Sequence, residues 1–461
     1  MRFGQYPSYR PNSIEWLPVL PHTWQHVRAR FVLGVNSSPV KQRELDDSAE
    51  VSFVPMEAVG EYGGLNLDRT KLLDEVGIGY TAFEDGDVVV AKITPCFENG
   101  KGALADGLVN GVAFGTTELH VLRAGTRLDR RFLFYLTMSH TFRALGESEM
   151  YGAGGQKRVP PEFVKDFRVP LPPIDEQQGI GRFLDAQTAR IDQLLAKKRD
   201  LIETLKEKRS ALISRAIIVG LPTKAVTTAE LQLKPDLKDS GTALVREIPQ
   251  TWNAVPLSHL VRMRGGATPD KGKPEYWDGE IPWVSPKDMK VASIDETEDH
   301  ISEEGLQKSA LSVIPIKSVL IVVRGMILAH SFPVAISERE LTINQDMKAL
   351  VCGKRVRPEF LYWALCGFSK ALVALADESA HGTKKIESTT LARFPIFVPP
   401  INEQQAIADY LDSETRRLDN LAAKVESAIT RLLEYRQALI TSAVTGKIDV
   451  RHRQAPALQA A

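Results

Sequence analysis

The sequence predicts an α+β protein with an internal pseudo-twofold repeat, in which two mixed domains are joined by two long antiparallel coiled-coil helices. The segment Leu-Pro-Pro-Ile-Asp-Glu-Gln-Gln at 171–178 recurs as Val-Pro-Pro-Ile-Asn-Glu-Gln-Gln at 398–405, an offset of 227 residues in a chain of 461. A long charged helical pattern follows each copy, and further motifs repeat upstream. Two like units that follow one another suit a ligand that is long and has two comparable parts.

The repeat extends ahead of the helices. Pro-His-Thr-Trp at 21–24 matches Pro-Gln-Thr-Trp at 249–252, and Phe-Leu-Phe-Tyr at 132–135 matches Phe-Leu-Tyr-Trp at 360–363. Short β-rich runs alternate with short helical patterns, and the two halves diverge almost completely between the anchors. We therefore expect one α+β scaffold that carries two different surfaces.

Each long helix is predicted to begin after its proline pair and to end at a glycine. Asp175 or Asn402 can cap the helix, and Gln178 or Gln405 three residues later completes a capping-box arrangement. The expected segments are a mixed domain at 1–172, a helix at 173–221, a second mixed domain at 222–398, a second helix at 399–448 and a disordered tail at 449–461.

The helices should pair along a heptad stripe. Broken only by Lys198, its apolar members are Leu184, Ile191, Leu205 and Leu212 in the first helix and Leu411, Leu418, Val425, Leu432 and Leu439 in the second. A second stripe is expected at Leu194, Leu201, Leu421 and Ala428. A helix of about 44 residues, roughly 65 Å long, cannot fold alone with this stripe in water, so antiparallel pairing is predicted. The rod then sets the distance between the domains.

Composition excludes several classes of protein. No apolar stretch resembles a signal peptide or approaches the roughly 18 residues of a membrane span, so a cytoplasmic protein without a membrane partner is expected. Cys96, Cys352 and Cys366 lack the paired spacing of disulfides or zinc sites. The net charge is zero, with 58 Lys and Arg against 58 Asp and Glu, and decides nothing about nucleic acid.

The motifs of common enzymes are missing. The chain has no Walker loop, no dinucleotide fingerprint, no His-Glu-x-x-His and no Cys-x-x-Cys, and its proline pairs lack the preceding Asn or Asp of amino-methyltransferases. We therefore predict no catalytic residue, no metal and no cofactor in this chain. His22 and His26 are interpreted as surface or packing residues. One alternative stays open, because Pro269-Asp270 with Asp288-x-Lys290 fits a metal-dependent nuclease, although Asp346-x-Lys348 fits its second half equally.

Loops rich in glycine and cations are the candidate binding segments. In 265–284 we expect Lys271 and Lys273 to contact phosphates, whereas core packing is favoured over base or sugar contact for Tyr276, Trp277 and Trp283. The loops 151–158 and 381–385 both place glycines before paired cations, which lets backbone and charge approach a phosphate. Solvated surface charge is the alternative. The full candidate set is Lys92, Lys101, Gly155, Gln156, Lys157, Arg158, Arg264, Thr268, Lys271, Lys273, Tyr276, Lys287, Arg324, His381, Thr383, Lys384 and Lys385.

These motifs together resemble the specificity (S) subunit of Type I restriction-modification systems. The resemblance rests on the Pro-Pro-Ile-Asp/Asn-Glu-Gln-Gln helix starts, the heptads, the Gly-x-Thr-Pro…Tyr-Trp-x-Gly-x-Ile-Pro-Trp-Val loop at 266–284 and the Gly- and Lys-rich loops, and it covers about 16–450. The first half departs from it, because Gly34-Val35-Asn36-Ser37-Ser38-Pro39 replaces the Gly-x-Thr-Pro form.

The resemblance implies a non-catalytic DNA-binding protein. Each target-recognition domain would read one half of a split, asymmetric double-stranded site, and the helices would act as a ruler for the unread spacer. Methylation subunits, two by expectation, would dock on the helices and bring S-adenosylmethionine, and restriction subunits would supply ATP- and Mg²⁺-dependent translocation and cleavage. A self-contained nuclease and a coiled-coil scaffold that binds only proteins are the alternatives.

Overall fold

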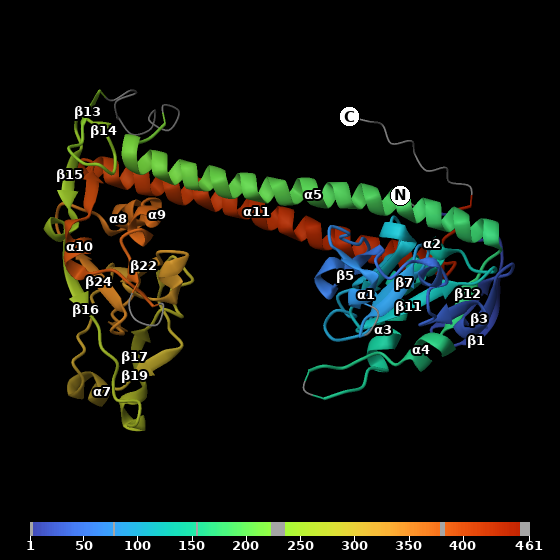
Figure 1. Ribbon diagram of the computed structural model, residues 1–461. Coiled ribbons are helices and arrows are strands. Elements are labelled where there is room, and N and C mark those ends of the chain that lie inside the picture. Colours follow the sequence, from blue (N-terminus) through green and yellow to red (C-terminus); the bar gives the residue numbers. More distant parts are fainter. Residues whose placement is uncertain (1–2, 77–78, 154, 223–235, 379–382, 452–461) are drawn as a thin grey trace. The chain divides into compact units, whose positions relative to one another are not determined.

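The computed structural model describes residues 3–76, 79–153, 155–222, 236–378 and 383–451 (Figure 1). The chain forms two compact units, 1–199 with 426–461 and 200–425. Each unit therefore holds one mixed domain, the N-terminal part of its own long helix and the C-terminal part of the other. In the described part of the chain, no helix has the length and apolar character that a membrane span requires.

Unit 1 is built on two four-stranded sheets. The first has the order β4-β11-β8-β9, with β4 Leu33–Val35, β11 Leu119–Ala124, β8 Val88–Ala91 and β9 Gly102–Leu104. The second has the order β6-β5-β10-β7, with β6 Thr70–Leu72, β5 Glu50–Val54, β10 Val112–Gly115 and β7 Thr81–Glu84. Two strand pairs join β1 Tyr9–Ile14 to β2 Leu17–Pro21 and β3 Gln25–Arg28 to β12 Arg168–Leu171. The helices are α1 Leu73–Val76, α2 Arg130–Met138, α3 His140–Ser148 and α4 Pro161–Asp166.

Unit 2 is built on a five-stranded sheet of order β16-β24-β20-β22-β18, with β16 Val261–Gly265, β24 Met347–Cys352, β20 Val319–Val322, β22 Val334–Ser337 and β18 Ser293–Ile294. Two three-stranded sheets contain β19 Asp299–Ile301, β17 Trp277–Val284 and β23 Thr342–Ile343, and β21 Arg324–Gly325, β26 Lys384–Lys385 and β25 Asp377–Glu378. Two strand pairs join β13 Leu237–Asp239 to β14 Glu247–Pro249 and β15 Asn253–Pro256 to β27 Pro395–Val398. The short helices are α7 Glu303–Lys308, α8 Pro358–Gly367, α9 Ser369–Val373 and α10 Ser388–Arg393.

The predicted internal repeat is present in the fold. The pair β3·β12 in unit 1 corresponds to β15·β27 in unit 2, and β4-β11-β8 corresponds to β16-β24-β20. The sequence anchors lie in the two cores. Trp24 and Phe132 make an edge contact with ring centroids 6.4 Å apart, and Trp252 and Phe360 make the same contact at 6.5 Å. All four side chains are fully buried, so one packing scheme serves both domains.

The long helices are α5, Ile174–Val219, and α11, Ile401–Val444. Both begin one residue ahead of the predicted caps, so the capping-box prediction for Asp175 and Asn402 was wrong. The adjacent glutamines act instead. Gln177 and Gln404 are fully buried, and each makes three hydrogen bonds to the backbone of its own unit.

One stripe of the predicted seam is confirmed and the other was wrong. Leu184, Ile191, Leu411, Leu418 and Leu439 are buried, and Leu205, Leu212, Val425 and Leu432 are half-buried. The exposed fractions of Leu194, Leu201 and Leu421 are 40–45%. The second stripe lies four residues after each first-stripe position, not three, and its buried members are Thr188, Leu195, Ile202, Ala216, Thr415, Arg436 and Ala443.

In each unit the two helices lie side by side and are joined by an ion pair (Figure 1). Arg436 bonds Asp192 at 2.6 Å in unit 1, and Arg209 bonds Asp419 at 3.0 Å in unit 2. Asp419 lies 227 residues after Asp192, and Arg436 lies 227 residues after Arg209, which is the repeat offset in both cases. The antiparallel register is thus the same in the two units, because a seam arginine meets the same acidic position of the other helix.

A glycine with positive φ follows the end of each helix, Gly220 directly after α5 with φ of 89° and Gly446 two residues after α11 with φ of 70°. A Cβ on Gly220 would lie 3.5 Å from the Trp252 ring, and one on Gly446 would lie 3.3 Å from the Trp24 ring. The folded chain continues to residue 451, because Asp449 bridges Gly4 and Val450 is buried. The predicted tail therefore starts too early, and its remainder, 452–461, lies outside the described residues.

Candidate nucleic-acid interface

One end of the first sheet gathers the candidate residues of unit 1. Because β8 runs antiparallel to both β9 and β11, Lys92 at the end of β8 lies beside Lys101, which precedes β9, and Glu118, which precedes β11. The Lys92 amide donates to the Glu118 carbonyl at 2.9 Å, and the Val159 amide donates to the Lys92 carbonyl at 2.8 Å. The loop 151–158 is therefore attached to this sheet end.

The paired cations of that loop differ in their contacts. Arg158 makes a bidentate ion pair with Glu118, with Nε–Oε2 and Nη2–Oε1 distances of 2.9 and 2.8 Å. This bond holds the pKa of Glu118 below its ordinary value. Arg158 thus joins its loop to the residue that precedes β11, whereas Gln156 and Lys157 are exposed to solvent. Lys101 is also turned inward, because its Nζ donates to the Met56 carbonyl at 2.9 Å.

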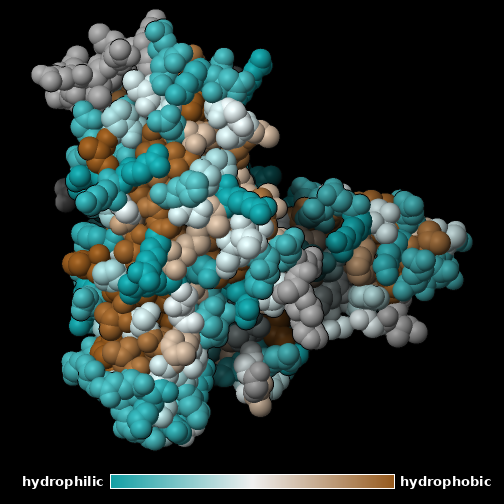
Figure 2. Space-filling view, turned by 90° about the vertical axis from the view of Figure 1, so that its left-hand side faces the viewer, coloured by the Kyte–Doolittle hydropathy of each residue, from teal (hydrophilic) through white to brown (hydrophobic). Residues whose placement is uncertain are grey.

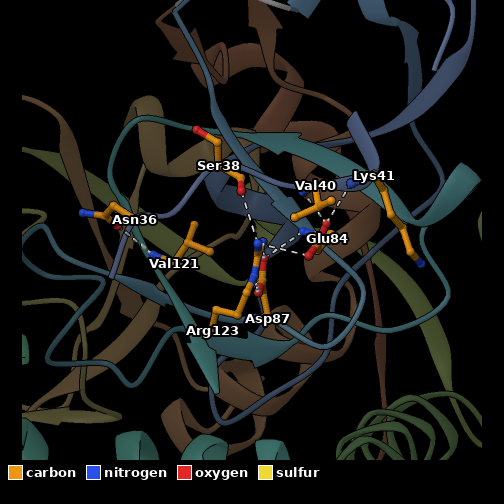
Figure 3. Close-up of polar contacts among 8 residues, drawn as sticks. All are labelled: Asn36, Ser38, Val40, Lys41, Glu84, Asp87, Val121 and Arg123. Carbon is orange, nitrogen blue, oxygen red and sulfur yellow. Dashed lines mark hydrogen bonds and ion pairs between the residues drawn. The ribbon is translucent and has the colours of Figure 1, made fainter. Parts of the chain in front are cut away.

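The loop 36–41, which departs from the family pattern in sequence, is held by a network that the sequence did not reveal (Figure 3). Arg123 on β11 bonds both carboxylate oxygens of Asp87 at 2.7 Å and lies 3.1 Å from Glu84. The same guanidinium donates to the Ser38 carbonyl at 3.2 Å. A charged residue next to an apolar strand segment needs a partner of opposite charge when it is buried. Asp87 and Arg123 are such residues, and this was the sequence feature that could have indicated the network.

The carboxylate of Glu84 completes the network. Its Oε2 accepts the amides of Val40 and Lys41 at 2.9 and 3.2 Å, while Asn36 Oδ1 accepts the Val121 amide at 2.9 Å (Figure 3). Glu84 on β7 and Arg123 on β11 therefore fix the loop beside the start of β8, at the opposite end of that strand from Lys92, and Asn36 joins the loop to the middle of β11. Such rigid support is what a base-reading loop requires.

A buried histidine ties this loop to the cation loop. His120 Nε2 lies 2.9 Å from the Val159 carbonyl, and its Nδ1 lies 3.4 Å from Asn36 Nδ2. Burial lowers the pKa of His120. A neutral ring that donates from Nε2 and accepts at Nδ1 fits both contacts.

The corresponding sheet end of unit 2 also gathers predicted residues. Arg324 follows β20, and its Nη1 lies 3.7 Å from Asp346, which precedes β24. Thr268, after β16, donates to the side chain of the adjacent Gln345. The backbone of Arg324 pairs with Lys385 across β21 and β26. The acidic residue that precedes the corresponding strand, Glu118 before β11 or Asp346 before β24, thus pairs with an arginine in both domains. The arginine comes from the loop 151–158 in unit 1 and from the segment that follows β20 in unit 2.

The remaining cations of unit 2 have varied partners. Arg264 Nη1 donates to the Val313 carbonyl at 3.0 Å, and Lys385 pairs with Glu387 at 2.6 Å. Lys287 lies off the sheet end, because its Nζ is 2.9 Å from both Glu298 and Asp299 in the β17·β19 region. Thr383 and Lys384 are half-buried in the segment that forms β26. His381 lies outside the described residues.

The aromatic residues immediately before β17 and within it pack as the core-anchor interpretation expects. Tyr276 and Trp283 are 7% and 5% exposed, and Trp277 meets Trp283 edge-on at 5.2 Å. The Tyr276 ring is therefore too buried to stack on a base. Its hydroxyl lies 3.2 Å from Lys273 Nζ and raises the pKa of that lysine. Lys271 is exposed.

The nuclease alternative finds no support in the geometry. Asp288 Oδ2 accepts from the amide and hydroxyl of Ser285 at 2.8 and 2.9 Å, and Asp270 accepts the Gly272 amide at 2.9 Å, so both carboxylates stabilise turns. Across the described residues, no group of three or more His, Cys, Asp or Glu side chains could hold a metal. His26 lies on strand β3, not on a helix.

Comparison with known proteins decides the family. The sequence profile of the Type I restriction modification DNA specificity domain matches residues 39–204 and 249–431, one match per domain and more than half of the chain. The chain belongs to this family. The resemblance inferred from the sequence is therefore correct, and so is the fold class of two tandem recognition domains joined by paired helices.

Relatives of this DNA specificity chain carry the same designation. The Type I restriction enzyme EcoEI specificity subunit of Escherichia coli is 38% identical over 210 residues, covering 44% of this chain and 35% of that protein. The EcoR124I/EcoR124II specificity subunit of the same organism is 36% identical over 182 residues, covering 39% and 44%. The alignments thus span less than half of these relatives. The HindI specificity subunit of Haemophilus influenzae is 21% identical over 438 residues, covering 83% and 91%.

Two solved structures share the fold of this specificity chain. The HsdS subunit from Thermoanaerobacter tengcongensis has a TM-score of 0.55 at 18% identity and covers 93% of this chain and 98% of its own. A chain from a study of complex assembly and conformational transition of the Type I R-M system has a TM-score of 0.68 at 18% identity, covering 92% and 98%. At this identity the likeness concerns the fold.

Proposed function

We propose that this chain is the specificity subunit of a Type I restriction-modification complex and that each domain reads one half of a bipartite, asymmetric DNA site. The observation that carries the proposal is the duplicated sheet end. Both domains place cations and rigid loops where β8 or β20 ends, on one scaffold but with different side chains. Phosphate contacts position such a domain, and individual side chains at base edges specify the sequence.

The chain itself is proposed to be non-catalytic. Methylation subunits, two in number, would dock on the helices and bind S-adenosylmethionine, and restriction subunits would use ATP and Mg²⁺. Leu194 and Leu201 on α5 and Leu421 on α11 support a protein-binding role for the helices, since 40–45% of each residue is exposed.

Exchange of one domain tests the division of labour. We expect that replacing residues 11–170 with the equivalent domain of a relative changes the bases of only one half-site, because the second sheet end and both helices stay unchanged. Sequencing of methylated adenines in a host that carries the chimera provides the measurement. Altered bases in both half-sites would contradict the proposal, and a complex that binds no DNA would favour the protein-scaffold alternative.

The salt dependence of binding tests the sheet end itself. Lys157→Ala in the assembled complex should weaken binding to all DNA sequences and lower the slope of log K against log salt by about one unit, because one phosphate contact is lost. Arg158→Ala should act differently, since it also leaves Glu118 without its partner. The control is Lys165→Ala on α4, a lysine outside the candidate set whose Nζ lies 3.6 Å from Glu162. Equal slopes for wild type and Lys157→Ala would mean that Lys157 contacts solvent and not a phosphate.

A further inference from the structure

A short turn at the sheet end of unit 2 presents an exposed apolar side chain. The 3-10 turn η7, Met326–Ala329, follows β21 directly. Leu328 is fully buried and anchors the turn in the core, whereas Met326 is 75% exposed and Ile327 is 37% exposed. Among the described large apolar residues, none exceeds Met326 in exposed fraction. With Leu328 fixed inside, the turn holds Met326 outside.

Cations border this methionine. The backbone of Gly325 pairs with Lys384, and that of Arg324 pairs with Lys385, so the residue before Met326 is fixed beside the predicted phosphate-contacting segment. Acidic residues are present too, because Arg324 lies 3.7 Å from Asp346 and Lys385 pairs with Glu387. Charged residues thus lie next to Met326 along the chain and across the strand pair. On the face drawn in Figure 2, hydrophobic patches lie among hydrophilic side chains.

The repeat places an apolar residue at the corresponding point of unit 1. There Ile93 bridges Arg158, and the Thr94 amide donates to the Lys157 carbonyl at 3.0 Å. The next residue is Pro95, which is also exposed. Both domains therefore carry an exposed apolar residue just beyond the same strand end and beside the paired cations, but the residue differs. A common position with a different side chain is what half-site discrimination needs.

We propose that Met326 is a specificity-determining residue that contacts the C5-methyl group of a thymine in the half-site read by the second domain. The inference rests on the proposed function. The thymine methyl is the apolar feature that identifies this base in the major groove. A methionine suits it, because its unbranched thioether adapts to irregular apolar surfaces. Contact with DNA would bury the apolar surface that its own domain leaves in water.

The experiment removes one methyl group at a time. In the complex of the full chain with its methylation subunits, each thymine of the second half-site is replaced by uracil, which lacks only the C5-methyl. Wild type should lose roughly fourfold in affinity at one position, the value for burial of one methyl-sized group. Met326→Ala should bind the thymine site more weakly and should not distinguish uracil from thymine there.

A matched control comes from the other end of β20. Ile316 is 54% exposed and precedes that strand, whereas Met326 lies beyond its end. Ile316→Ala should keep the full uracil effect. Because both residues are exposed, neither alanine substitution should disturb folding. A third variant, Met326→Gln, keeps the length of the side chain while removing its apolar character, so it should behave like Met326→Ala.

The inference would be overturned by a second half-site without thymine, by uracil sensitivity that Met326→Ala retains, or by the absence of a sensitive position in wild type. Loss of subunit assembly in Met326→Ala would assign the residue to a protein interface and overturn it as well. If wild type shows no sequence-specific binding at all, the proposed function itself fails. The two failures are therefore distinguishable.

Discussion

Replacing Gln177 with alanine is expected to lower the free energy of unfolding of unit 1 by about 3 kcal/mol. The side chain is fully buried, and its Nε2 donates to the carbonyls of Arg127 and Pro172 at 3.0 and 2.8 Å. Its Oε1 accepts the Asp129 amide at 2.8 Å. Alanine leaves three backbone groups without partners, and each buried unsatisfied group costs roughly 1–3 kcal/mol. Entry of water into the space would recover part of this loss.

The neighbouring residue provides the control. Gln178 is exposed, so Gln178→Ala should change stability little. In unit 2, Gln404 makes the same three bonds, to Arg355, Pro399 and Arg357, and Gln404→Ala should destabilise that unit instead. Because a chain of two units need not unfold in one step, hydrogen exchange in urea at α2 and α8 is the suitable measurement. Equal protection in Gln177→Ala and Gln178→Ala would refute the proposed role.

This pair of glutamines also shows where the sequence is ambiguous. The repeated Gln-Gln marked the helix starts correctly, but the carbonyls that Gln177 and Gln404 bond belong partly to residues about 50 positions away. A capping box is a local pattern, so it was the interpretation available without tertiary contacts. The prediction located both helix starts, but it assigned the hydrogen-bonding role to Gln178 and Gln405 when Gln177 and Gln404 make the buried bonds.

The heptads show a similar limit. The leucine stripe from Leu184 and Leu411 was predictable, since an apolar residue every seven positions indicates a seam. The step to the second stripe can be three or four residues, and the large side chains of Leu194 and Leu201 favoured three. The structure uses four and buries Thr188 and Ala216 on that face. Small and polar residues can line a seam, and periodicity of large apolar residues does not reveal them.

The sequence pattern selects candidate loops but not their contacts. Glycines before paired cations single out these loops, and the strand register brings Lys92, Lys101 and Arg158 to one sheet end. Their role in DNA binding stays a prediction. Whether a charged side chain can contact DNA depends on the partners that it already has within the protein. Arg158 is bound to Glu118, and Lys101 is bound to the Met56 carbonyl. Such pairings join segments far apart in the sequence, which no local pattern encodes.

Insertion of seven residues after both Lys197 and Lys424 is expected to lengthen the unread spacer of the DNA site by about three base pairs. Both positions lie next to the boundaries between the units, at 199/200 and 425/426. The ion pair Asp192–Arg436 stays on one side of the insertions and Arg209–Asp419 on the other, so both interhelical registers are preserved. Seven residues add roughly 10 Å at 1.5 Å per residue, which is about three steps of 3.4 Å in duplex DNA.

The half-sites should keep their bases, because neither sheet end is altered, and some of the added length can be taken up by the rotation of the duplex. Methylome sequencing of a host that carries the variant measures both quantities at once. The matched control inserts seven residues into α5 alone, which shifts one helix against the other, separates one of the two arginine–aspartate pairs and should abolish methylation. A spacer of unchanged length, in a doubly inserted variant that still methylates both half-sites, would mean that the helices do not set the distance between the recognition domains.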